Sequence, residues 1–513
     1  MLNFAKFTFF SIGWSILSIT EAFATVTAQQ VWSDLRQKLT ANGFQISATE
    51  FRKDDTLTLS DLIAKYDLPL PEADGLGSVS LTLETVQFVD NLDGTVKIVL
   101  PNIMPVTLVL KDAIGGAVDL QLDVTQSDLE ISVSGQGQDR RYRYGAQSLG
   151  LKVRKLFLDE IELPETAANS MLSVSMLRGS SIQSKSTLHQ FNQVLSLDEV
   201  AYEINIAVPD VPNTTAHFSG KLSNFSFIGN ALLPLFGPWT GPLDFLAAGA
   251  QGDGNWQSGA SQSAFLISEN DKKIEYSAQT AAGSGTVALN KDQFLYRGES
   301  SGLEMFLLLD NLPFPISVSM SKVAANLLLP LAASPQAEPF GFGILLSNLA
   351  LSDMLWSLFD ANDILPRDPL SVALDISGTL KILSDLFSPD ALTEFSNPKH
   401  MPLELESLSV DQFELSGADT SLSAVGGFTF DNRDLETFSG FPRPLGKIEA
   451  KLIGGHGLLD RLITIGLLPK NEAMGMRMMM GMFTVPGVGD DVLDTVLEVT
   501  KKGHFLANGQ RIR

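Results

Sequence analysis

The chain has 513 residues, with 36 Lys and Arg against 59 Asp and Glu, which gives a formal net charge of −23, and it contains no cysteine. With 44% hydrophobic and 19% charged residues, it has the composition of a folded protein with large cores, not of a disordered acidic tail. The negative charge argues against binding to DNA or RNA, because phosphate neutralisation needs clustered Lys and Arg. The absence of cysteine excludes disulfides, thiol nucleophiles, iron–sulfur clusters and cysteine-ligated zinc.

Residues 1–24 are typical of a secretory signal peptide. Lys6 provides a positive start, an apolar stretch runs over 7–19, and Ala22-Phe23-Ala24 supplies the small-x-small pattern that a signal peptidase cleaves after. A membrane anchor is the alternative, but the apolar stretch is short for a span and Glu21 interrupts it. We predict cleavage after Ala24, export to a bacterial periplasm and no transmembrane segment in the mature chain.

A helix is predicted at the start of the mature chain. Thr27 can cap it, and Gly43 ends it. Between them Val31, Trp32 and Leu35 lie on one stripe at helical spacing. This segment is therefore expected to pack one face of the helix on the remainder of the protein.

Period-two alternation then dominates the chain. Val79, Leu81 and Leu83 alternate with polar residues, and 96–100 is expected to pair with them across a turn at 90–94 that contains Asp93-Gly94. Such alternation predicts antiparallel sheets with one apolar and one polar face. Further strands are predicted at 118–124, 129–133, 218–228, 372–383, 403–415, 421–430 and 448–453.

Helical patterns are few and short in the remainder of the chain. They cover 352–359, 389–395, and the pair 456–468 and 471–483, which Pro469 separates. The chain ends in a predicted hairpin, with strands at 493–500 and 504–512. The predicted fold class is α+β, predominantly antiparallel β, with elongated curved sheets, few short helices, and a helix pair and terminal hairpin near the C-terminus.

One stretch of sequence is echoed at an offset of 152 residues. Tyr144, Ser148, Gly150 and Leu151 match Tyr296, Ser300, Gly302 and Leu303. The match is either a coincidence or a duplicated β-rich unit. The predicted modules after the signal peptide are 25–215, opening with the helix, 216–345, a second β-rich module and candidate duplicate, and 346–513, with the helix pair.

No catalytic, cofactor-binding or metal-binding residues can be assigned from motifs. The five histidines are scattered and no His-Glu-x-x-His occurs, which argues against a zinc peptidase. There is no Gly-x-Ser-x-Gly elbow. Ser-x-x-Lys occurs at 319–322, in an alternating stretch, and at 396–399, where a proline interrupts it. We therefore predict no catalytic, cofactor or metal site.

Six methionines fall within residues 474–482. A thioether copper site would need them on one face with a histidine nearby, and helical geometry spreads them around the axis. They suit either an adaptable surface for lipid or a partner, or gap-filling in a packed helix. Packing between sheet and neighbouring helix is the favoured interpretation.

The C-terminal third resembles the bacterial domain-of-unknown-function family numbered 2125, whose members are exported proteins of similar length. The resemblance is dense from about 360 to 513 and looser before, and it rests on the following segments: Leu365-Pro-Arg-Asp-Pro369, Phe428-Thr-Phe-Asp-Asn432, Phe441-Pro-Arg-Pro444, Gly457-Leu-Leu-Asp460 and Asn508-Gly-Gln-Arg511. The family implies no activity and no site residues. The long alternating strands also look like AsmA-type envelope proteins, which implies curved β-grooves that shield lipid tails.

These observations favour a non-enzymatic periplasmic protein that binds lipid or another amphipathic envelope component, such as an outer-membrane component, in an apolar β-groove. The alternative is a structural or protein-interaction scaffold with closed, packed sheets. A hydrolase assembled from dispersed Ser, Asp and His is the third hypothesis. Alternation does not distinguish an open apolar face from a packed one.

Overall fold

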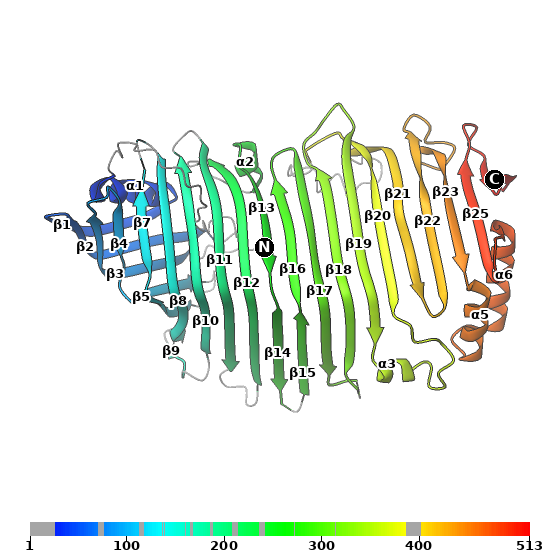
Figure 1. Ribbon diagram of the computed structural model, residues 1–513, viewed down its shortest axis with the longest axis horizontal. Coiled ribbons are helices and arrows are strands. Elements are labelled where there is room, and N and C mark those ends of the chain that lie inside the picture. Colours follow the sequence, from blue (N-terminus) through cyan, green and yellow to red (C-terminus); the bar gives the residue numbers. More distant parts are fainter. Residues whose placement is uncertain are drawn as a thin grey trace. The chain divides into compact units, whose positions relative to one another are not determined.

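The computed structural model describes residues 26–69, 76–111, 117–135, 137, 139–159, 161–164, 168–184, 188–207, 214–234, 242–270, 272–312, 314–385 and 402–512. The predicted signal peptide, 1–24, and the predicted helix at 389–395 lie outside them. Antiparallel strands with a few short helices dominate the rest, which confirms the predicted class (Figure 1). The chain divides into unit 1, Met1–Ala278 with Leu308–Leu312, and unit 2, Gln279–Leu307 with Pro313–Arg513. Both predicted module boundaries, at 215/216 and 345/346, fall inside strands, and the modules stay a prediction.

Unit 1 begins with a helix and continues as an antiparallel sheet. Strand β3 pairs with β2 and, over different parts of its length, with β4 and β5. The sheet continues through β7 and β6 to β8, and then through β10 and β11 to β12. The bounds are α1 Ala28–Ala41, β1 Phe44–Lys53, β2 Thr56–Pro69, β3 Leu76–Asp90, β4 Val96–Val99, β5 Ile103–Lys111, β6 Ala117–Ser127, β7 Glu130–Ser134, β8 Asp139–Leu158, β9 Ile161–Glu162, β10 Ala168–Ser184, β11 Leu188–Ala207, β12 Thr214–Pro234, α2 Pro242–Ala247, β13 Gln251–Ser258, β14 Ser261–Glu269 and β15 Lys272–Thr280.

Unit 2 is a meander whose strands pair in chain order from β16 to β23 and then with β25. The predicted helix pair is present as α5 and α6, and the predicted terminal hairpin is present as β25 and β26. The bounds are β16 Ala282–Leu289, β17 Gln293–Leu309, β18 Ile316–Pro330, β19 Glu338–Leu351, α3 Asp353–Ser357, β20 Leu370–Ile382, β21 Leu403–Gly417, β22 Thr420–Asp431, β23 Arg443–Ile453, α5 Gly455–Thr464, α6 Lys470–Phe483, β24 Val485–Pro486, β25 Val492–Val499, β26 Phe505–Ala507 and β27 Gln510–Arg511.

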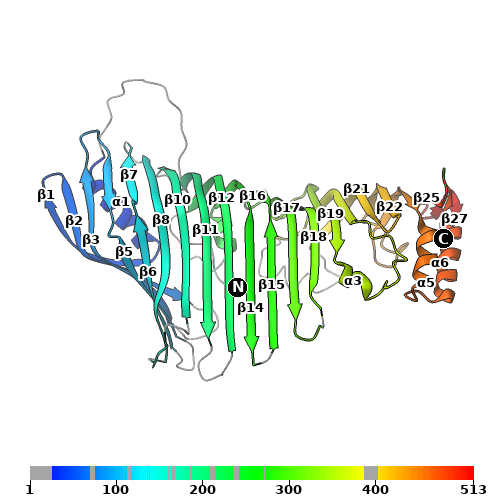
Figure 2. The same ribbon diagram turned by 60° about the horizontal axis from the view of Figure 1, so that its bottom comes forward.

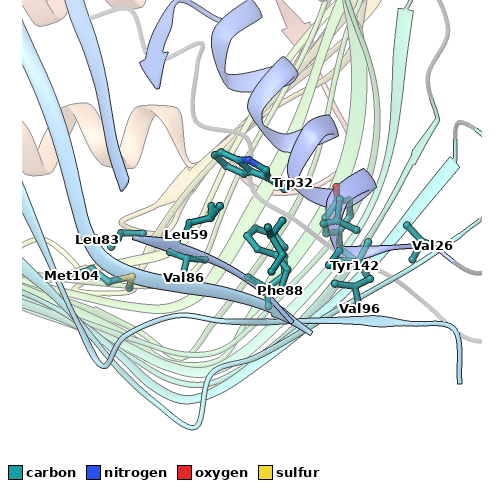
Figure 3. Close-up of a cluster of buried hydrophobic side chains, with 14 residues drawn as sticks. Val26, Trp32, Leu59, Leu83, Val86, Phe88, Val96, Met104 and Tyr142 are labelled. Atoms are coloured by element: carbon teal, nitrogen blue, oxygen red, sulfur yellow. The ribbon is translucent and has the colours of Figure 1, made fainter. Parts of the chain in front are cut away.

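The predicted first helix is confirmed, together with its cap. The Thr27 hydroxyl accepts the Gln30 backbone N–H at 3.3 Å, and the Gln30 side chain accepts the Thr27 N–H at 3.0 Å, which forms a capping box. Val31 and Trp32 are buried against β2, β3 and β4 (Figure 3). This is the main core of unit 1, and it contains Val26, Ala28, Val31, Trp32, Leu57, Leu59, Leu83, Val86, Phe88, Val96, Ile98, Met104, Val133 and Tyr142.

The predicted pairing of Val79 and Leu81 with 96–100 is wrong. Only Gln87–Asp90, next to the turn, pairs with β4, whereas Val79 and Leu81 lie opposite Leu108 and Val106 of β5. The turn fixes Asp90 opposite Val96, so residues further up β3 would need a longer partner than β4. β4 ends at Val99, just before Pro101, and β5 takes over the pairing.

Residues with positive φ interrupt the alternation of several strands near their middle. In unit 1 they include Asp61, Met176 and Asn224, whose φ angles are 53°, 51° and 49°. Met176 lies opposite Gln147, between the pairs Ser175↔Ser148 and Leu177↔Ala146. Such irregular residues shift the side-chain alternation by one position.

The shift keeps the core side chains of these strands on one face. Leu59 and Leu62 flank Asp61 at odd spacing, yet both pack in the core around Trp32. Val86 and Leu83 in β3 do the same. A strictly regular strand would place each pair on opposite faces. These irregularities therefore let apolar residues on both sides of the shift contribute to the same core.

Met176 is the residue at these positions for which the left-handed conformation is least suited. Asp and Asn adopt positive φ more readily than other side chains. We expect Met176→Asn to raise the free energy of unfolding by about 1 kcal/mol. Urea denaturation measures the change, and Met171→Asn, in the same strand at ordinary φ, is the control. Equal or lower stability of Met176→Asn would show that φ strain is absent there.

Candidate functional site

Three rows of directly paired residues run across one face of unit 2, from β16 to β25, without a charged side chain. Each row follows the register from strand to strand. We call these three rows the apolar face of unit 2: Gly285, Gly298, Ala325, Ile344, Leu374, Phe413, Ala424, Ala450 and Thr495; Val287, Tyr296, Leu327, Phe342, Ile376, Val410, Gly426, Ile448 and Leu497; Gly283, Ser300, Val323, Leu346, Val372, Leu415, Leu422, Leu452 and Leu493.

No member of these rows is buried. Ile344 is 38% exposed, Phe342 42% and Leu415 45%, although all three lie in the middle of the sheet. Apolar residues on a core-facing sheet surface are normally covered by a second layer. The apolar face of unit 2 is therefore open to solvent among the residues that the structure describes.

The other side of the same strands carries the charges. Glu299 on β17 pairs with Lys322 on β18 at 2.7 Å, and Lys447 and Glu449 on β23 pair at 2.6 Å. The carboxylate of Glu449 is the first cause of a raised Lys447 pKa, through a hydrogen bond. Each pair is solvent-exposed and contributes little to stability. The two faces of the sheet thus differ sharply in chemistry.

Unit 1 has a comparable row whose first residues are buried and whose last residues are half-buried. It passes through Leu57, Phe88, Ile98, Ile131, Tyr144, Gly179, Leu195, Phe227 and Trp256. Leu57 and Phe88 are each 1% exposed beneath α1, whereas Leu195, Phe227 and Trp256 are only half-buried. Helix α1 therefore covers the first strands of this face and leaves the later ones open.

Aromatic rings lie over glycines on the neighbouring strands of this face. Tyr202 is paired with Gly220, and a Cβ placed on Gly220 would lie 2.3 Å from the Tyr202 ring. Tyr144 over Gly179 and Phe340 over Gly378 repeat the arrangement, with closest approaches of 2.5 and 2.6 Å. Each glycine permits the close approach of a ring. These rings therefore lie close to the backbone of the neighbouring strand, in unit 1 at Gly179 and Gly220 and in unit 2 at Gly378.

A polar cluster lies where α1 meets β8 and β10. Asp34 and Arg140 form an ion pair at 2.8 Å, and their side chains are 12% and 8% exposed. Lys38 donates to Gln183 and lies 5.7 Å from the centre of the Tyr142 ring. Burial, followed by the Asp34 charge, raises the pKa of Tyr142 to about 12. This cluster anchors α1 on the sheet, and no sequence motif indicates it.

The residues considered for chemistry are not brought together. In the described ranges no three His, Asp or Glu side chains are grouped to hold a metal ion. His189, His217, His456 and His504 lie in or next to different elements, and His400 lies outside the described residues. In the first Ser-x-x-Lys, at 319–322, Lys322 is the ion-pair partner of Glu299. The second, at 396–399, lies outside the described residues.

A shallow depression of about 640 Å³ lies where β4, β7, β8 and β10 meet. It is lined by cations, among them Arg143 and Arg178, and by carboxylates, among them Glu130. Lys97 and Glu130 approach to 3.9 Å across it. Ile131 and Tyr144 of the apolar row of unit 1 also line it, so charged and apolar groups share this depression.

The favoured interpretation of the methionine cluster, gap-filling in a packed helix, is wrong. Only Ala473 is buried in α6, whereas Met474, Met478 and Met479 are 68%, 74% and 59% exposed. The predicted helix is present, but its buried residue is a small one, and most of its methionine side chains are exposed to solvent. The sequence could not show this, because methionine is common in both environments.

No helix in the described ranges has both the length and the apolar character needed to cross a membrane. Comparison with protein-family models and with curated proteins gives no match for the chain. The resemblance to the family numbered 2125 and to AsmA-type proteins therefore stays a prediction.

Proposed function

We propose that the chain is a non-enzymatic, exported periplasmic protein that binds lipid acyl chains on its open apolar face. The uncovered, charge-free rows across β16–β25 carry this proposal. Exposed apolar patches beyond a few hundred Å² are rare on soluble proteins and usually mark interaction sites. An acyl chain supplies the missing second layer, while its headgroup stays at the edge of the sheet in water.

The dimensions of the face fit this ligand. β20 is 13 residues long, and at about 3.3 Å per residue a strand of this length spans roughly 40 Å. In unit 2 the Phe340 ring lies next to Gly378 on the neighbouring strand, where no side chain holds the ring away from the sheet. The predicted signal peptide supports the compartment, with cleavage after Ala24.

A binding experiment tests the proposal. The full mature chain is purified, delipidated, and titrated with a monomeric fluorescent fatty acid and with a fluorescent phospholipid. We expect saturable uptake of both, and native mass spectrometry of undelipidated protein should show co-purified lipid. If neither fluorescent probe binds and native mass spectrometry finds no co-purified lipid, the proposal is contradicted.

The structural scaffold is the competing hypothesis. It requires a closed, packed face, or a protein partner that covers the open one. In that case crosslinking in the periplasm captures a protein on β19–β21, and delipidated protein takes up no fatty acid. The experiment above therefore separates the two functions.

A further inference from the structure

Helix α6 presents an apolar stripe to solvent. Met474, Met478 and Met482 follow one another at intervals of four residues, which places them on one side of the helix. They are 68%, 74% and 57% exposed, whereas Ala473, on the other side, is fully buried. The helix thus buries a small residue and exposes its large apolar ones, the reverse of an ordinary surface helix.

The C-terminal end of α6 contacts the last strand of the apolar face of unit 2. The carbonyl of Phe483, the last residue of α6, accepts hydrogen bonds from the Thr495 hydroxyl at 2.5 Å and from the Asn508 side chain at 3.0 Å. Thr495 is the final member of the row that begins at Gly285. Figures 1 and 2 both show α6 beside β25. Met482, next to Phe483 in sequence, therefore lies near the last strand of the proposed acyl-binding surface, and Met478 and Met474 follow along α6.

Charge distinguishes this segment from the remainder of the chain. Residues 467–489 contain Lys470, Arg477 and Glu472 as their only charges, a net of +1, within a chain of −23. Leu467 and Val488, at the two ends of the segment, are 55% and 95% exposed. Arg477 is paired with Asp460 of α5 at 2.6 Å, so the segment presents little net charge. It therefore repels negatively charged phospholipid less than the acidic remainder of the surface does.

We propose that α6 docks on the surface of a phospholipid bilayer through Met474, Met478 and Met482, and so places the apolar face in contact with the membrane. The inference rests on the proposed lipid binding, and it names α6 as the place where lipid passes between the membrane and the apolar face. Amphipathic helices bind bilayers by burying their apolar side at the level of the headgroups. Methionine suits this role because its flexible, polarizable side chain adapts to disordered lipid.

Vesicle flotation with the full mature chain tests the docking. Vesicles of phosphatidylethanolamine with a fifth of phosphatidylglycerol are mixed with wild type and with the triple variant Met474→Gln, Met478→Gln, Met482→Gln. Gln has nearly the helix propensity of Met, so folding is preserved. We expect binding at least about tenfold weaker for the triple variant. Met171→Gln with Met354→Gln, which replaces exposed methionines elsewhere, should bind as wild type does.

Uptake of monomeric fluorescent fatty acid separates this proposal from the proposed function. The triple variant should take up fatty acid as wild type does, yet transfer it between vesicles at least about tenfold more slowly. Wild-type protein that does not float with vesicles, or a triple variant that floats equally well, overturns the docking while leaving lipid binding intact. The single variant Met478→Gln, at the most exposed position, keeps the test decisive should the triple variant fail to fold.

Discussion

Arg140→Met is expected to lower the free energy of unfolding by about 3–5 kcal/mol, because it removes the guanidinium that is ion-paired with the buried Asp34 carboxylate. The pair lies beneath α1 at 2.8 Å, with both side chains almost inaccessible to water. Removing one member of a buried pair costs far more than removing both, since a lone charge remains in a poor dielectric. Urea denaturation monitored by the fluorescence of Trp32 and the other tryptophans measures the loss.

Two control variants define this result. The double variant Asp34→Leu, Arg140→Met removes both charges and should recover most of the stability. Arg52→Met breaks the exposed pair with Asp90, also 2.8 Å long, and should cost less than about 1 kcal/mol. Equal losses for Arg140→Met and Arg52→Met would mean that the cluster under α1 is hydrated in solution.

The double variant Ile344→Asp, Phe413→Asp is expected to weaken fatty acid binding at least about tenfold without unfolding the protein. The two residues flank Leu374 in one row of the apolar face, so an acyl chain crossing the row would have to desolvate a carboxylate. Each methylene that loses its contact removes about 0.8 kcal/mol of binding, and about 1.4 kcal/mol is a factor of ten. Both positions are solvent-accessible, so the folded state tolerates the charges.

The matched control places the same charges on the opposite face. The control is Asn326→Asp, Gln412→Asp. Asn326 on β18 and Gln412 on β21 are the sequence neighbours of Ala325 and Phe413 in that row, so their side chains lie on the opposite face. This variant has the same change in net charge and should bind fatty acid as wild type does. Titration with fluorescent fatty acid gives the affinities, and circular dichroism gives the midpoint of thermal unfolding. Equal affinities for the two double variants would place lipid binding elsewhere.

The sequence sufficed for those elements whose pattern is local. Helix α1 could be predicted because Thr27 and Gln30 form its cap within four residues, and α6 because Pro469 precedes a run of helix formers. Strands such as β21 and β22 follow from period-two alternation. The pairing of Val79 with β5 could not be predicted in the same way, since partner choice depends on the lengths of strands distant in sequence.

The candidate site depended on interactions that are not local. Alternation showed that each strand has an apolar side, but Met176 and Asp61 shift that alternation, and only the register shows that the sides form one face. Asp34 and Arg140 are separated by 105 intervening residues in the chain and meet only through the packing of α1 on β8. The exposure of the α6 methionines is likewise a tertiary feature, because the helix packs through the side that carries Ala473 and leaves the side with Met474, Met478 and Met482 in solvent.

The length, the absence of cysteine and the charge of −23 were determined by the sequence alone, together with the antiparallel β class and the positions of most strands. These follow from composition and from the period-two alternation of apolar and polar residues, which is visible within a single strand. Only the tertiary structure decided that the apolar sides align into continuous rows and that no described layer covers them in unit 2. An identical alternating strand serves a packed core or an open face, because the difference lies in what packs on it.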